Sequence, residues 1–287
     1  LKRVAERLGV TSDYVFPAFE DVFYYMWRER RLPGNVDPFD SRVDDALERE
    51  RLMKVFTQGM TYTVGHTLPI MKNVYGEWQT GPWFLRAERC YLFPGDSAMG
   101  YRLPIDSQPW TSKSDYPYVN PPDAETATDP LASHAALRAR VSGERAASVP
   151  QMQDRRTGTT TSGFTDASGK GRPWEKPTDT VPGFKESAAW ITRLAMCAEP
   201  RDGKLYIFMP PTHKLEDYLE VVAAVEATAD EMQLPVILEG YEPPSDPRLT
   251  HFRVTPDPGV IEVNIHPAKS WAQLVKQTTH LYESAYY

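Results

Sequence analysis

The stretch ITRLAMCAEPRDGKLYIFMPP, residues 191–211, contains the strongest fold signal of the chain. Two apolar runs flank the turn sequence PRDG, and the dipeptide Asp202-Gly203 is typical of a two-residue β-hairpin. We therefore predict two antiparallel strands that meet at this turn. The sequence after the hairpin supplies the rest of a sheet and the helices that cover it.

The segments after the hairpin predict a helix, three strands and a second helix. The first helix is amphipathic, and the strand LPVILEGY is apolar on both faces, which predicts a central position in the sheet. The last helix begins after Ser270, a good N-cap residue. This order predicts an α+β fold, an antiparallel-rich sheet with helices on one face. The elements cover residues 214–233, residues 234–241, the two halves of residues 250–267, and residues 270–287.

The N-terminal part, residues 1–122, is predicted to be helical and loop-rich. A first helix should end at Gly9, a second is predicted over 18–32, where aromatic residues follow helical spacing, and a third over 41–56. Residues 62–110 contain short apolar runs separated by glycine and proline, which predicts strands and turns.

Residues 123–187 differ from both flanks in composition. Only nine of these 65 residues are valine, isoleucine, leucine, methionine, phenylalanine, tryptophan or tyrosine, and alanine, threonine, serine, glycine, arginine and proline dominate. Such a segment buries too little apolar surface to offset its chain entropy. We therefore predict a disordered insertion here, which divides the chain into residues 1–122, 123–187 and an α+β part over 188–287.

The bulk composition excludes several classes of function. The net charge of −7 and the pI near 5.5 provide no basic surface for a nucleic-acid backbone. No apolar run reaches the ~20 residues that span a bilayer. Two cysteines far apart in the sequence form neither a disulfide framework nor a zinc motif, and they predict free thiols in a reducing cytoplasm.

The stretch GVIEVNIHP, residues 259–267, alternates polar and aliphatic residues. Glu262, Asn264 and His266 share one face of the predicted strand, and the aliphatic residues between them share the other. From the residues alone, an antiparallel strand with one solvated face is the better-supported interpretation. A row of metal ligands is the alternative.

A second carboxylate, Glu239, ends the apolar run VILE at the edge of the predicted strand. A carboxylate in this position needs a partner, because a bare buried charge is costly. Magnesium is one candidate, since it prefers carboxylate oxygens. A salt bridge with Arg248 or Arg253 is the other.

The stretch from residue 90 to residue 106 offers further polar groups. Arg102 could clamp a substrate carboxylate through its two-pronged donor geometry, or it could pair with Asp96 or Asp106. Ser97 lacks a GxSxG elbow, and Cys90 has no histidine near it in the sequence. GDSAMG lacks the ending of a phosphate-binding loop. No serine hydrolase is therefore predicted, and a cysteine nucleophile is not favoured.

Six longer stretches carry a resemblance to a known family: YYMWRERRLPGNVDPFDS, FPGDSAMGYRLPIDSQPW, DYPYVNPPD, EPRDGKLYIFMPP, LEDYLEVVAAVEATA and TPDPGVIEVNIHPAKSW. They resemble a bacterial amidoligase family of the glutamine-synthetase-like carboxylate–amine ligase superfamily. The resemblance covers nearly all of the chain except residues 123–187. It implies that part of a glutamine-synthetase-like catalytic sheet is present.

The resemblance also implies a chemistry. ATP phosphorylates a carboxylate, and an amine attacks the acyl phosphate to give an amide or peptide bond. Mg²⁺ ions among carboxylates on the concave face of the sheet offset the phosphate charge. Glu262 is then expected to be the principal metal ligand, with Asn264 and His266 on the same face and Glu239 on a second strand. Arg102 would orient the substrate carboxylate.

The same resemblance implies partners and a domain context. A transglutaminase-like domain is expected upstream in the same polypeptide, and a glycine-rich nucleotide-contacting segment beyond Tyr287. The chain begins at Leu1 and ends at Tyr287 within helical patterns. We therefore expect an internal fragment of a cytoplasmic protein, inactive alone, that acts on small-molecule or peptide carboxylates and amines and binds neither nucleic acid nor membrane.

A second class of function stays open from the sequence. The chain could be a non-catalytic module that presents peptide to the transglutaminase-like domain, with Phe23, Tyr24 and Trp27 at its binding surface. Core packing is the simpler explanation of these aromatic residues. Protease or transglutaminase activity of this segment ranks last, because no nucleophile motif is present. Neither the substrate nor the oligomeric state can be deduced.

Overall fold

The computed structural model describes residues 1–24, 61–85, 89–94, 101–116, 129–142, 176–257 and 259–286. The chain forms two compact units, Leu1–Pro244 and Ser245–Tyr287, and each is treated by itself below. Within the described ranges, no helix is both long enough and apolar enough to cross a membrane.

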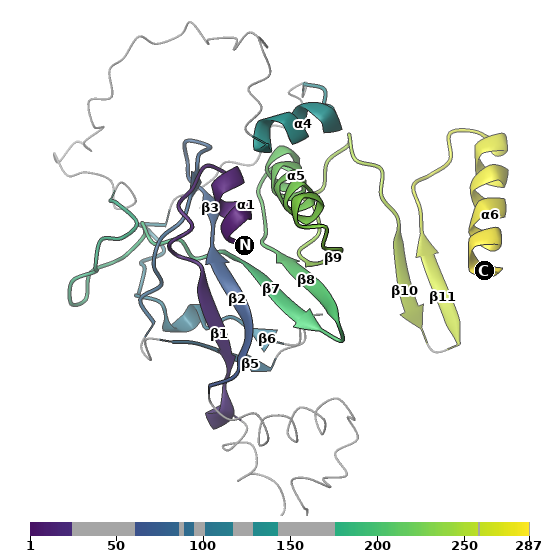
Figure 1. The fold of residues 1–287 in the computed structure, drawn as a ribbon. Helices are drawn as coiled ribbons and strands as arrows, with labels where there is room; N and C mark the ends of the chain where they lie inside the picture. Colours follow the sequence, from purple (N-terminus) through teal and green to yellow (C-terminus); the bar gives the residue numbers. More distant parts are fainter. Residues whose placement is uncertain are drawn as a thin grey trace, which may run out of the picture. The chain divides into compact units, whose positions relative to one another are not determined.

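The first unit is built on a curled seven-stranded sheet (Figure 1). Neighbouring strands are antiparallel except for the pairs β1–β5 and β8–β9, which are parallel. The sheet is therefore mixed, and the predicted antiparallel-rich sheet is confirmed only in part. In spatial order the strands are β6 (Tyr101–Arg102), β5 (Cys90–Pro94), β1 (Phe16–Glu20), β2 (Thr63–Pro69), β7 (Ala195–Arg201), β8 (Lys204–Met209) and β9 (Val236–Gly240).

The hairpin predicted from PRDG is confirmed as β7 and β8. Arg201 pairs with Lys204, so the loop has only two residues. Both of these, Asp202 and Gly203, have positive φ values, 49° and 75°, as a type I′ turn requires. The turn therefore fixes the register of the hairpin from local sequence alone.

The helix after the hairpin is confirmed as α5 (Leu215–Met232), which connects β8 to its parallel neighbour β9. The prediction that β9 is a central strand is wrong, because β9 ends the strand order of the sheet. Its residues divide between two environments. Val236 packs against the core, whereas Ile237 and Leu238 are 38% and 41% exposed.

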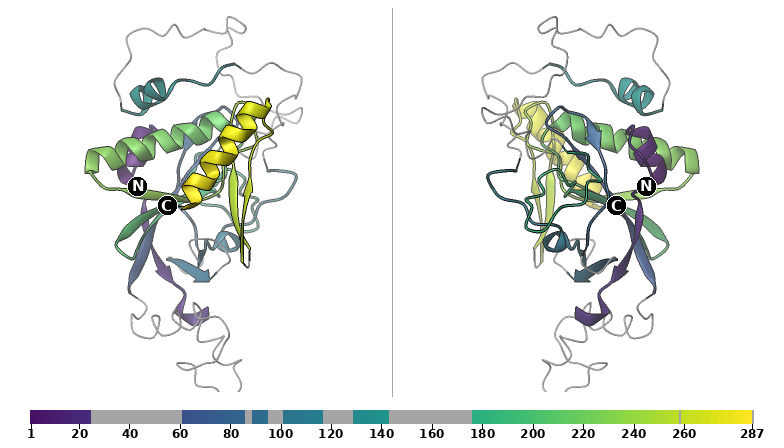
Figure 2. Two further views of the ribbon diagram at one scale, coloured as in Figure 1. Left: turned by 90° about the vertical axis from the view of Figure 1, so that its right-hand side faces the viewer. Right: turned by 90° about the vertical axis from the view of Figure 1, so that its left-hand side faces the viewer.

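The main core lies between one face of this sheet and the helices α1 (Lys2–Arg7) and α5 (Figures 1 and 2). Aliphatic residues and methionines from β2, β7 and β8 meet the apolar faces of both helices. Of the two helices expected on one face of the sheet, α5 is found there, whereas the helix predicted over 270–287 belongs to the second unit. The largest side chains buried in this core include Leu68, Ile70, Met196, Met209 and Val221.

A short helix, α4 (His134–Val141), lies within the range predicted to be disordered. The Oγ of Ser133 caps it by accepting a hydrogen bond from the backbone of Ala136 at 3.2 Å. Leu137 and Val141 are buried in the main core, and α4 packs against α5. The prediction of disorder is therefore wrong for these eight residues. Their two apolar side chains are enough to pack the short helix against α5.

The predicted helical N-terminal region is confirmed only in part. The first helix exists, and Gly9 follows it with a φ of 75°. The second predicted helix is wrong at its start, because Phe16–Glu20 form β1, which pairs with β2 and β5. Sheet pairing on both sides overrides the helical spacing of the aromatic residues. The third predicted helix, over 41–56, lies outside the described residues, as does most of the second.

Two further small elements complete the first unit. The strands β3 (Met71–Lys72) and β4 (Trp78–Gln79) form a separate short hairpin, and the 3-10 helix η1 (Ile105–Ser107) follows β6. Strands and turns were predicted for residues 62–110, and the described residues of this range confirm them.

The second unit contains the two strands and the helix predicted for this part of the chain, but the strands do not join the larger sheet as expected. Strands β10 (Arg253–Asp257) and β11 (Val260–Asn264) are antiparallel and form a sheet of their own. Helix α6 (Trp271–Tyr286) begins after Ser270, whose Oγ accepts a hydrogen bond from the backbone of Gln273 at 3.2 Å. The N-cap prediction for Ser270 is therefore confirmed.

A substitution at Gly65 tests the pairing of β2 and β7. A Cβ at this position would lie 2.6 Å from the backbone oxygen of Ala198, so the two strands would have to move apart. We expect Gly65→Ala to lower the free energy of unfolding by about 1–3 kcal/mol, measured by urea denaturation. Thr63→Ala, at an exposed position of the same strand, is the control and should have little effect. Equal stability of the two variants would contradict the tight packing of these strands.

Candidate functional site

The sheet of the first unit has a second face, opposite α1 and α5, that carries buried polar residues. Cross-strand partners share a face, and the register aligns Thr67 with Cys197, Cys197 with Phe208, and Phe208 with Glu239. Side chains two residues apart on a strand also share a face. Glu199, two residues after Cys197, therefore lies on the same face as Glu239.

Two carboxylates and one guanidinium form a cluster on this face. Arg201 donates a hydrogen bond from Nη2 to Oε2 of Glu239, and its Nε lies 3.7 Å from Oε2 of Glu199. The side chains of Arg201, Glu199 and Glu239 are only 24%, 10% and 8% exposed. The guanidinium carbon also lies 3.7 Å from the ring centroid of Tyr206. Together the three charged groups leave a net charge of −1 in a poorly hydrated place.

One of the two carboxylate oxygens of Glu239 has no hydrogen bond to any described residue. Oε1 of Glu239 is buried and lacks a hydrogen-bond partner within the part of the chain that the structure describes. A buried carboxylate oxygen of this kind is costly unless a cation or a donor reaches it. The cluster is thus suited to accept a positive group in addition to Arg201.

The structure corrects part of the sequence interpretation of Glu239. The carboxylate does need a partner, as predicted, but that partner is Arg201 of β7. Arg248, one of the two arginines proposed for this role, instead binds Asp246 through its side chain, with distances of 2.9 and 2.6 Å. Glu199 was missed, because its position before Pro200 resembles the start of a turn.

A third buried acid, Glu20, lies near the end of β1. It is two residues from Ala18, which packs in the small apolar cluster around Cys90, Leu92 and Cys197 on this side of the sheet. Across the described ranges, no three histidine, cysteine, aspartate or glutamate side chains are close enough together to hold a metal ion. Glu20 therefore does not complete a three-ligand site with Glu199 and Glu239.

Both cysteines of the chain are buried, and Cys197 lies on the same face of β7 as Glu199. Burial raises the pKa of both Cys90 and Cys197 to about 12, and a contact of 3.6 Å joins Cys197 Sγ to Oγ1 of Thr67. A thiol with such a pKa is almost entirely protonated near neutral pH. The prediction that the two cysteines are free thiols is confirmed, and their raised pKa values do not favour a nucleophilic role.

Thiol labelling gives a direct test of this burial. At pH 8 we expect iodoacetamide to alkylate the folded protein at least about a hundredfold more slowly than the same protein in urea. Mass spectrometry of a time course measures both rates, and both Cys90 and Cys197 should react once the chain is unfolded. Modification of either cysteine within minutes, with the circular dichroism spectrum unchanged, would contradict the burial.

The polar residues predicted on one face of GVIEVNIHP do share that face in β11 and just beyond it. Asn264 Nδ2 donates a hydrogen bond of 2.8 Å to Oε1 of Glu262, and the His266 ring meets the His251 ring edge-on at 5.1 Å. All four side chains are exposed. Arg253, the partner of Asn264 in β10, lines a shallow depression of about 510 Å³ together with both histidines. Glu262 and Asn264 share a face as predicted, but Ile265, expected on the face away from solvent, is 36% exposed; metal binding by these residues stays a prediction.

The candidate site residues therefore fall into separate groups. Glu239 belongs to the first unit, whereas Glu262, Asn264 and His266 belong to the second, so each group is assessed in its own unit. Arg102 lies exposed on β6, at the opposite end of the strand order from β9. Its role as a carboxylate clamp stays a prediction.

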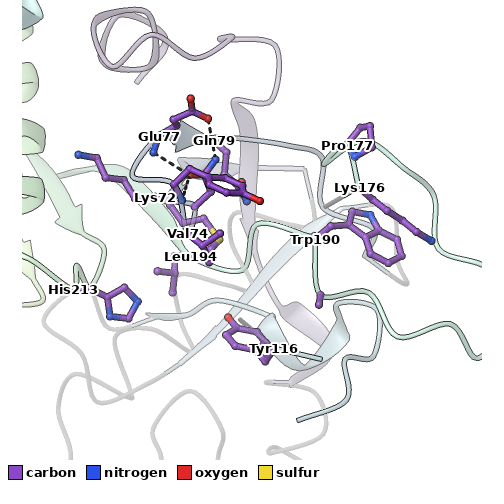
Figure 3. Close-up of a pocket in the computed structure, with 14 residues that line it drawn as sticks. Lys72, Val74, Glu77, Gln79, Tyr116, Lys176, Pro177, Trp190, Leu194 and His213 are labelled. Carbon is purple, nitrogen blue, oxygen red and sulfur yellow. Dashed lines mark hydrogen bonds between the residues drawn. The ribbon is translucent and has the colours of Figure 1, made fainter. Parts of the chain in front are cut away.

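A separate pocket of about 330 Å³ lies in the first unit, beside the β3–β4 hairpin (Figure 3). None of the carboxylate cluster residues lines it. Figure 3 shows Trp190 and Lys176 on one side of the hollow, His213 on the other, Glu77 above and Tyr116 below. This pocket has no signal in the sequence, because its walls come from five segments that are separate along the chain.

Comparison with known proteins gives one match. A family model described as "Putative amidoligase enzyme (DUF2126)" matches residues 1–287. No curated protein and no solved structure matches the chain. The chain therefore belongs to the DUF2126 family of amidoligase-type proteins.

Proposed function

We propose that the protein is an ATP-dependent carboxylate–amine ligase that forms an amide or peptide bond through an acyl phosphate. The observation that carries the proposal is the buried carboxylate pair Glu199–Glu239, on the sheet face opposite α1 and α5 of a chain that belongs to an amidoligase family. Ligases of this type must bring the negative charges of a nucleotide and a carboxylate together. A site with fixed carboxylates can do so through a divalent cation.

The residues of the cluster fit Mg²⁺ as a site with few protein ligands. Mg²⁺ is usually held by one or two carboxylates together with waters and substrate phosphates, rather than by an all-protein cage. Oε1 of Glu239 is buried and has no hydrogen-bond partner within the described residues, and Glu199 offers a second carboxylate. When bound, the metal would offset phosphate charge and orient the transferred group.

The remaining groups of the cluster have roles that follow from their contacts. Arg201 holds both carboxylates in place, and its guanidinium contacts the ring of Tyr206. A guanidinium in this position can also bind a phosphate or carboxylate oxygen of a substrate. Arg201 is thus a second candidate for substrate orientation, besides Arg102.

The proposal retains Glu262, with Asn264 and His266, as an alternative metal site in the second unit. Their hydrogen-bonded, solvated arrangement supports ligand binding less directly than the buried pair does, because exposed groups are already satisfied by water. An upstream transglutaminase-like domain, which could supply or receive peptide, is also part of the proposal.

ADP release tests the function. The full-length polypeptide is incubated with ATP, Mg²⁺, and a pool of amino acids and peptides, and ADP is measured by coupled absorbance. We expect release that requires both a carboxylate and an amine, and that stops when EDTA removes Mg²⁺. Release without an amine would indicate an ATPase, and no release with any pool would favour a non-catalytic peptide-binding module.

A further inference from the structure

The pocket beside the β3–β4 hairpin has the size and chemistry of a small-molecule site. Its volume of about 330 Å³ is at the lower end of the range of ligand pockets, which suits a single-ring compound. Its floor and walls are mainly apolar and aromatic. The apolar and aromatic lining residues are Met71, Val74, Tyr75, Tyr116, Pro177, Ala189, Trp190 and Leu194.

The two lysines that line the pocket are already bound by carboxylates. Lys72 Nζ donates hydrogen bonds of 2.7 and 2.8 Å to Asp217 and Glu220, and Lys176 Nζ donates to Glu186. Three partner carboxylates therefore face two ammonium groups. The pocket offers no unpaired lysine to an anionic ligand.

The carboxylate of Glu77, by contrast, lines the pocket without a cationic partner within the described part of the chain. Its Oε2 accepts a hydrogen bond of 3.3 Å from Asn73 Nδ2. Oδ1 of Asn73 in turn accepts from the backbone of Tyr75 and of Glu77, at 2.9 and 3.0 Å. The tip of the hairpin thus fixes Glu77 at the rim, with one carboxylate oxygen left for a ligand.

The aromatic wall shows how an ammonium can sit in this pocket. Lys176 Nζ lies 4.4 Å from the ring centroid of Trp190, a cation–π contact made by the chain itself. Tyr75 and Tyr116 add two further aromatic rings to the lining. Aromatic rings with a carboxylate are a common arrangement for binding organic cations.

We propose that this pocket binds a primary ammonium carried on a small apolar body, with Glu77 accepting from the ammonium and Val74 and Leu194 contacting the apolar part. The site is separate from the carboxylate cluster and does not depend on the proposed ligase activity. Its ligand class is an arylalkyl or alkyl amine.

Three probes of matched shape and different charge test the proposal: phenethylamine, 2-phenylethanol and 3-phenylpropionate. Binding to the protein is followed by ligand-observed NMR titration at low ionic strength. We expect phenethylamine to bind at least roughly fivefold more tightly than the other two, the size of one exposed ion pair. Glu77→Gln should reduce phenethylamine binding by about the same factor and leave 2-phenylethanol unchanged.

Glu6→Gln, on α1 away from the pocket, is the matched control and should bind like the unchanged protein. Glu77→Gln keeps an oxygen that can accept from Asn73, so the hairpin should stay folded, which circular dichroism checks. The proposal is overturned if all three probes bind equally, if none binds, or if Glu77→Gln and Glu6→Gln have the same effect.

Discussion

Replacing Glu239 with glutamine in the full-length polypeptide should reduce its ADP release by about a hundredfold or more. Loss of a residue that only supports a metal ligand typically costs 10–100-fold, so loss of a direct ligand should cost at least the upper value. The change removes one negative charge and keeps the shape of the side chain. Arg201 can still donate to the amide oxygen of the variant, so the fold should persist. Initial rates at several Mg²⁺ concentrations measure the effect, and the Mg²⁺ requirement should rise with the loss of rate.

Two further variants distinguish a specific effect of the carboxylate cluster from a general effect of removing a carboxylate. Glu199→Gln should show a loss of similar size, because both carboxylates are held by the same guanidinium. Glu226→Gln, which removes an exposed carboxylate that contacts His134 and Arg138, is the control and should leave the rate unchanged. If Glu239→Gln is active and Glu262→Gln is inactive, the proposed metal site must lie in the second unit instead.

The elements that could be predicted from sequence are those fixed by local interactions. The turn at Asp202-Gly203 requires positive φ at two positions, and only a few residue pairs supply it. Helix α5 and the N-cap at Ser270 depend on spacing and on one side-chain hydrogen bond. The residues that determine each of these elements lie close together in the chain, so a single sequence is enough to predict them.

The errors concern properties that depend on distant parts of the chain. The apolar residues of β9 indicated burial on both faces, but the position of a strand in a sheet depends on which strands pair with it. At β1, pairing with β2 and β5 decided between helix and strand for residues 16–20. Neither the edge position of β9 nor the strand conformation of β1 can be predicted from the residues next to it in the sequence.

Only one residue of the carboxylate cluster could be predicted from the sequence. Glu239 could be found, because a carboxylate at the end of an apolar run needs a partner. Its partners could not be found, since Arg201 and Glu199 are about 40 residues away and meet it only through the register of β7, β8 and β9. The alternation of Cys197, Glu199 and Arg201 on one strand face was the available signal.

The largest expected effect on stability comes from Arg201. Replacing it with methionine should lower the free energy of unfolding by about 3–5 kcal/mol in the absence of Mg²⁺, because removing one partner from a buried ion pair leaves uncompensated charge. Here the side chains of Glu199 and Glu239 would remain, each no more than 10% exposed. Urea denaturation at pH 7 measures the loss. Arg3→Met, at an exposed arginine of α1, should leave the urea midpoint unchanged.

The same variant separates a metal site from a structural salt bridge. If the two carboxylates can bind Mg²⁺, the ion should replace the missing guanidinium charge and restore about 1.4 kcal/mol at a concentration tenfold above its Kd. A purely structural pair should gain nothing from Mg²⁺ beyond the ionic-strength effect of a matched sodium chloride solution. Adding Glu199→Gln and Glu239→Gln to Arg201→Met should restore stability without any metal and abolish the Mg²⁺ response. Persistence of that response in the triple variant would place the metal elsewhere, whereas its loss would tie the cation to these two carboxylates.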